Sequence, residues 1–60
     1  MYCVQFKTKS GQIEEYFYYN EDDAQKHLSV FEDDDSGLYD EILLLKEKSD
    51  GDEVLQRIIY

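Results

Sequence analysis

The sequence contains no proline or tryptophan, one cysteine and three glycines among its 60 residues. A single cysteine, Cys3, excludes an internal disulfide and is typical of a reducing compartment. The longest apolar run, Ile42 to Leu45, is far too short to span a bilayer. The first residues lack the basic and apolar segments of a signal peptide, so we expect a cytoplasmic protein without a membrane partner.

Positive charge is also scarce, because six lysine and arginine residues stand against 15 acidic ones and give a net charge of −9. Binding to DNA, RNA or an anionic membrane requires positive charge, so we expect no direct contact with nucleic acid. The balance permits a basic protein partner. With 42% hydrophobic residues the chain is too apolar for a disordered acidic tail, and residues 1–60 are expected to form one domain.

A domain of this size hides only about 60% of the surface that its unfolded chain exposes. Small domains are usually supported by disulfides, a structural metal or oligomerisation. The lone cysteine excludes the first support, and no metal-binding motif supplies the second. The sequence therefore favours self-association.

What is present in the first third of the chain is a strand pattern. Residues 2–9 alternate between apolar and polar side chains, and residues 12–19 resume as a second β-rich run. Ser10-Gly11 between them indicates a turn. A two-residue turn would place Val4 opposite Phe17.

A helix is predicted next, because Asn20 is a favoured N-cap and three acids follow it in the first turn. The helix should end near Glu32 or Asp33. Its apolar stripe comprises Ala24, Leu28 and Phe31.

A second hairpin is expected from residues 38–48 and 53–60, joined through an Asp50-Gly51 turn that places Lys48 opposite Glu53. The order ββαββ predicts an α+β, two-layer fold: a four-stranded, mostly antiparallel sheet with one helix on one face. Strand order stays open, although a crossover over the first strand would give the wholly antiparallel order 2-1-3-4.

Ile42 to Leu45 is apolar on both strand faces, and one helix covers only one of them. We therefore predict a homodimer through the uncovered face. The two-residue first turn would place Tyr16 and Tyr18 on that face, beside Cys3. On the second hairpin, the set that carries Lys46 and Arg57 is favoured. The candidate interface residues are Tyr16, Tyr18, Ile42, Leu44, Leu55, Arg57 and Ile59.

The run Glu32, Asp33, Asp34 and Asp35 is unusual, because anions at a helix C-terminus are disfavoured by about 0.3–1 kcal/mol each. Its alternate spacing partly matches an EF-hand calcium loop, but the twelfth place holds Leu43 rather than glutamate. We expect a solvated loop, with a surface for a basic protein as the alternative. On dipole grounds, changing Asp33 and Asp34 to asparagine should slightly stabilise the fold.

His27 and Cys3 are the only residues of their types, and no long loop is predicted that could form a cleft around them. We expect no catalytic residue, no metal and no cofactor. The favoured function is a small non-enzymatic interaction module that self-associates and offers an acidic surface to a protein partner. One alternative is an acidic inhibitor that mimics nucleic acid in the basic groove of another protein. The other is a structural accessory without a dedicated ligand.

Overall fold

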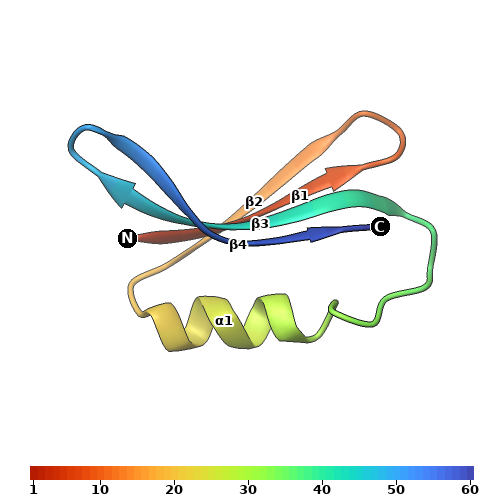
Figure 1. Cartoon of the computed structure of the whole chain (residues 1–60), viewed down its shortest axis with the longest axis horizontal. Coiled ribbons are helices and arrows are strands. Elements are labelled where there is room, and N and C mark those ends of the chain that lie inside the picture. Colours follow the sequence, from red (N-terminus) through yellow and green to blue (C-terminus); the bar gives the residue numbers. More distant parts are fainter.

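The computed structural model describes all residues 1–60 and contains one four-stranded antiparallel sheet and one helix, in the order ββαββ. The strands are β1 (Tyr2–Thr8), β2 (Ile13–Tyr18), β3 (Tyr39–Lys48) and β4 (Gly51–Ile59). The order across the sheet is β2-β1-β3-β4, so the chain crosses β1 between β2 and β3. Helix α1 (Glu21–Ser29) covers one face of the sheet (Figure 1). The predicted α+β fold is confirmed.

The hydrophobic core lies between α1 and the two central strands. Val4, Phe6, Ile42 and Leu44 point toward the helix and meet Ala24 and Leu28 from above, and each of these six residues is at most 1% exposed. Tyr2, Tyr18, Phe31, Tyr39 and Ile58 close the rim of this core. Of the predicted helix stripe, Ala24 and Leu28 are buried on α1, whereas Phe31 lies beyond the end of the helix and is half-buried.

The first hairpin has a three-residue loop, Lys9 to Gly11, instead of the predicted two-residue turn. The Gly11 N–H donates to the Thr8 carbonyl over 3.1 Å, and the Thr8 N–H donates to the Gln12 carbonyl over 2.9 Å. Gly11 has a φ of 92°, the left-handed conformation that the last residue of such a loop requires. The extra residue slips the register by one, so Val4 lies opposite Tyr16 and not Phe17.

The second hairpin also differs from its prediction. Lys48 pairs with Gly51, so the two loop residues are Ser49 and Asp50. A β-bulge at Leu55 then shifts the pairing, because Leu45 lies opposite Val54 whereas Leu44 lies opposite Gln56. One inserted residue moves every later side chain of the strand to the opposite face of the sheet.

Helix α1 is shorter than predicted and ends at Ser29. Beyond it the chain continues in tight turns, in which the N–H groups of Phe31 and Glu32 donate to carbonyls three residues earlier. Asn20 occupies the N-cap position, but its side chain contacts Asp23 at 3.4 Å instead of capping a backbone N–H. No helix of the chain is both long and apolar enough to cross a membrane.

Candidate interaction surface

The sheet face opposite α1 is uncovered, and the strand registers arrange its side chains in three rows that cross all four strands. In the order β2, β1, β3, β4, the first row is Phe17, Cys3, Leu45 and Val54; the second is Glu15, Gln5, Leu43 and Arg57; the third is Ile13, Lys7, Glu41 and Ile59. We call this set the open face. Its first row is apolar, whereas the other two mix apolar and charged side chains.

The two edge strands carry the exposed apolar side chains of the open face. On β2, Phe17 is 54% exposed and Ile13 is 60% exposed; on β4, Val54 is 55% exposed and Ile59 is 69% exposed. Each pair brackets one charged residue, Glu15 on β2 and Arg57 on β4. The two edges therefore repeat one pattern, apolar–charged–apolar, with opposite charges in the middle.

An ion cluster joins the inner strands to β4. Glu41 is only 8% exposed, and its carboxylate accepts from Lys7 Nζ at 3.0 Å and from Arg57 Nε. Hydrogen bonds from these two cations hold the pKa of the Glu41 carboxyl below its ordinary value. This cluster neutralises the one acid that the sheet buries.

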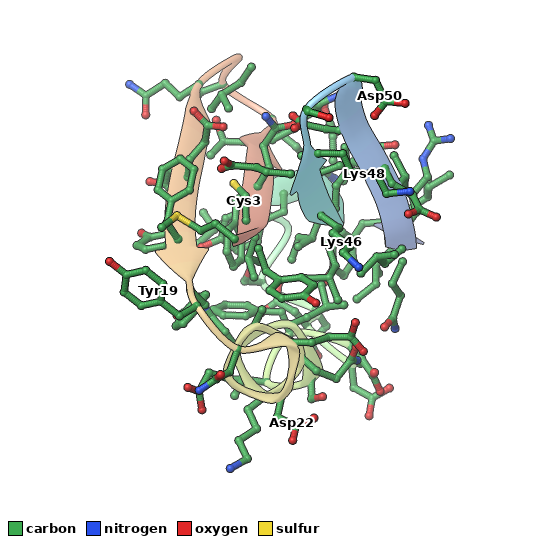
Figure 2. The ribbon with its side chains drawn as sticks, turned by 90° about the vertical axis from the view of Figure 1, so that its left-hand side faces the viewer. Cys3, Tyr19, Asp22, Lys46, Lys48 and Asp50 are labelled. Carbon is green, nitrogen blue, oxygen red and sulfur yellow. The ribbon has the colours of Figure 1, made fainter.

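Cys3 lies on the open face between β2 and β3, and Figure 2 shows it on β1 near the middle of the sheet. Its thiol donates to Glu15 Oε2 at 3.7 Å, and Gln5 Nε2 donates to the same oxygen at 3.4 Å. Burial, together with the negative charge of Glu15, raises the Cys3 pKa to about 11. The side chain is therefore a neutral thiol at neutral pH and packs as a small apolar group.

His27 lies on the other side of the sheet from Cys3. Its Nδ1 is 2.7 Å from the Tyr18 hydroxyl, and its ring packs within 6 Å of Phe6, Tyr16 and Phe31. Burial lowers the pKa of His27. With the sheet between them, the thiol and the imidazole do not form a nucleophile–base pair.

The candidate interface residues from the sequence do not all lie on one face. Arg57 and Ile59 lie on the open face. Ile42 and Leu44 are in the core, so their placement on the uncovered face is wrong; the bulge at Leu55 separates them from Arg57 and Ile59. Leu55 itself is the extra residue of that bulge and is 37% exposed.

The register slip of the first hairpin moves Tyr16 and Tyr18 to the helix side, where both pack against His27, so their predicted face is also wrong. Sequence reasoning missed the residues that replace them, Phe17 and Glu15 of β2. Gly11 was the available signal, because glycine at the third loop position is typical of a three-residue hairpin. It would have placed Ile13, Glu15 and Phe17 on one face.

Acidic residues gather in the helix layer. Between residues 21 and 35, Lys26 is the only lysine or arginine. The acids of this segment are Glu21, Asp22, Asp23, Glu32, Asp33, Asp34 and Asp35. Asp22, at the start of α1, points away from the sheet (Figure 2). The open face, in contrast, carries two acids and two bases in its three rows.

Within the acidic run, Asp34 differs from its neighbours. Its Oδ2 accepts from the Ser36 hydroxyl at 2.6 Å and from the Ser36 N–H at 3.3 Å, whereas Glu32, Asp33 and Asp35 are exposed. Asp34 therefore helps to form the loop that leads into β3. No group of three or more histidine, cysteine or acidic side chains is arranged to hold a metal ion.

One hollow opens beside the first hairpin loop, on the same side as the loop before β3. Its lining residues are Thr8, Lys9, Ser10, Gln12, Glu14, Gly37, Leu38 and Tyr39. Only two of the eight are hydrophobic. An open hollow with so few hydrophobic residues lacks the apolar enclosure typical of a small-molecule site.

Comparison with known proteins identifies no relative: no family model, no curated protein and no solved structure matches the chain.

Proposed function

We propose that the protein is a small, non-enzymatic assembly module that forms a homodimer through the open face and turns its acidic helix layer toward a basic protein partner. The observation that carries the proposal is the open face itself. Four large apolar side chains are more than half exposed there, at its corners, and no element of the chain covers them. Several large, exposed apolar side chains on one face of a small domain are typical of an interaction site.

The free energy gained by burying this surface is large compared with the free energy of unfolding of the domain. Complete burial of one such side chain contributes roughly 1.5–3 kcal/mol. A domain of 60 residues has a stability of about 3–9 kcal/mol at roughly 0.05–0.15 kcal/mol per residue. Partial burial of four corner residues in a dimer is therefore a substantial stabilisation.

Charge opposes association, because each chain carries a net charge of −9. In a dimer formed by the open faces, however, each helix layer lies on the outer side of its own sheet. The two sheets alone are about 10 Å apart, which already exceeds the screening length of about 8 Å at physiological salt. The acidic layers are then too far apart to repel strongly.

A non-enzymatic role agrees with the positions of Cys3 and His27 on opposite sides of the sheet. The unpaired thiol suits a reducing compartment, and we propose that the protein acts in the cytoplasm.

Sedimentation equilibrium at micromolar concentration tests the dimer. The wild-type protein should have twice the chain mass, and Leu43→Lys, in the middle of the open face, should have the chain mass. Val30→Lys is the matched control, because Val30 is exposed beyond the end of α1 and should leave the dimer intact. A wild-type protein that stays monomeric at micromolar concentration would refute self-association. The open face would then be a candidate binding surface for a different protein.

The acidic helix layer supports the second half of the proposal. A polylysine peptide is the probe: combined Asp33→Asn and Asp35→Asn should weaken its binding more than combined Glu14→Gln and Asp50→Asn, which remove equal charge from the hairpins. Equal weakening would show that only net charge matters. A nucleic-acid mimic is the second candidate function, but the acids of the helix layer form clusters at the two ends of α1 and not an even row.

A further inference from the structure

The open face is self-complementary about one particular two-fold axis. We infer that two copies of the chain pack with this axis parallel to the strands and between β1 and β3, so that β2 of each copy faces β4 of the other. The inference rests on the proposed homodimer and specifies its geometry. It follows from the residues that the strand registers bring into line.

A two-fold axis along the strands keeps each row in place and reverses the order of the strands. At the edges, Phe17 then faces the partner's Val54, and Ile13 faces the partner's Ile59. These contacts bury the exposed apolar corners of both copies against one another. Aligned packing of this kind is one of the two usual ways in which sheets stack.

The charged residues match under the same rotation. Glu15 faces the partner's Arg57, and Lys7 faces the partner's Glu41. By symmetry each of these contacts occurs twice. Within one chain Glu15 and Arg57 lie on opposite edges of the sheet, about 14 Å apart at roughly 4.8 Å per strand, so they do not pair with each other.

The other two-fold axis in the plane of the sheet, perpendicular to the strands, gives unfavourable contacts. It keeps each strand column in place and reverses the rows, so Glu15 faces the partner's Glu15 and Arg57 faces the partner's Arg57. It also sets the apolar Leu45 against the partner's Glu41. Like charges brought together at an interface oppose association, which selects the axis along the strands.

The size and shape of the open face agree with such a dimer. The four strands contain 32 residues, and at about 3.3 Å per residue and 4.8 Å per strand the sheet covers roughly 500 Å² in projection. Specific interfaces bury at least about 500 Å² on each partner. Figure 1 shows the two hairpin turns raised at opposite ends of the sheet on the side away from α1. Under the rotation along the strands, the raised β3–β4 turn of one copy lies over the partner's β1 and β2, at the end of those strands that is away from their own turn.

Charge exchange between two variants tests the geometry. Glu15→Arg alone places two arginines together at both symmetric contacts, and Arg57→Glu alone places two glutamates together. Each variant should dimerise at least about tenfold more weakly than the wild type. In an equimolar mixture, the new arginine of one variant faces the new glutamate of the other, so a heterodimer should form that is tighter than either homodimer. Arg57→Glu also removes an intrachain partner of Glu41, so the affinity of this heterodimer should stay below that of the wild type.

Glu14→Arg is the matched control, because it makes the same charge change one residue earlier on β2 and on the opposite face. It should not weaken the dimer. Thermal melting of each variant separates unfolding from lost association, and one copy carrying a mass tag identifies the heterodimer by native mass spectrometry. If the wild type dimerises but the mixture stays monomeric, the inferred axis is wrong and the homodimer stands. If the wild type is monomeric, the homodimer itself is wrong.

Discussion

The two faces of the sheet are built from the same strands, yet they reach different degrees of burial. Toward α1, the inner strands bury Val4, Phe6, Ile42 and Leu44 completely. On the open face the inner strands bury Cys3, Leu45 and Glu41, while the edge strands leave their large apolar side chains exposed. Neighbouring strands are thus enough to shield the middle of a small sheet, but its edges require a covering layer.

The polar groups of the two faces also have different kinds of hydrogen-bond partner. On the covered face, the Tyr18 hydroxyl meets His27, and Gln25 Nε2 donates to Gln56 Oε1 at 2.7 Å. On the open face, the polar contacts are made by two carboxylates: Glu41 pairs with Lys7 and Arg57, and Glu15 accepts from Cys3 and Gln5. A neutral network suits a buried core, whereas charged groups suit a surface that is wet in the monomer.

The largest difference in stability between the two faces is expected when Leu44, on the covered face, and Leu43, on the open face, are each truncated. Leu44→Ala leaves a cavity beneath α1 and should lower the free energy of unfolding by about 2–5 kcal/mol at every protein concentration. Leu43→Ala should cost less, and its cost should grow with protein concentration if the open face is a dimer interface. Urea denaturation at two concentrations measures both. Equal, concentration-independent losses would show that the faces are equivalent.

Low pH should destabilise the fold through Glu41, on the open face. Because its folded-state pKa is depressed, its ion pairs contribute stability above its ordinary pKa of about 4.5, and this contribution is lost as the pH falls through the lower folded value. Glu41→Gln should therefore make the loss of stability below pH 4.5 shallower, as measured by urea denaturation. An unchanged slope would mean that the cluster does not stabilise the native state.

The covered face should lose stability in a different pH interval, through His27. Its pKa is lowered by burial, so the unfolded chain binds a proton more readily, and stability should begin to fall as the pH drops below about 6.5. His27→Phe keeps an aromatic ring among Phe6, Tyr16 and Phe31 and should abolish this part of the pH dependence. The measurement is the melting temperature between pH 7 and pH 5.5; persistence of the dependence in His27→Phe would assign it to other groups.

The smallest effects are expected in the acidic run, away from both faces. Asp33→Asn should stabilise the fold by about 0.3 kcal/mol at low salt, because it removes an exposed anion near the negative end of α1. Asp34→Asn should instead destabilise it by about 0.5 kcal/mol, because an amide oxygen accepts the two hydrogen bonds from Ser36 more weakly than the carboxylate oxygen of Asp34 does. The sequence alone predicts that both substitutions stabilise the fold, and the Ser36 donors are the reason to expect a different effect at Asp34. Stabilisation by Asp34→Asn would show that charge outweighs these bonds.

Much of the fold was predictable from local patterns. Alternation identified the strands, the acids after Asn20 identified the helix start, and the stripe of Ala24 and Leu28 identified the buried helix face. The register between β1 and β2 was harder to predict from the sequence, because both faces of β2 are rich in apolar and aromatic residues. Phe17 and Tyr16 are each acceptable opposite Val4 by hydrophobicity, so composition did not fix the register.

The sequence by itself determined the element order, the two-layer architecture and the excess of apolar surface over what one helix covers. Only the tertiary structure decided which residues form that surface. A single loop residue before Gln12 and a single bulge residue, Leu55, each shift a strand by one position. Because side chains alternate between faces with a period of two, each shift moves every later side chain of that strand to the other face. Loop and bulge geometry therefore placed Glu15 and Arg57 together on the open face.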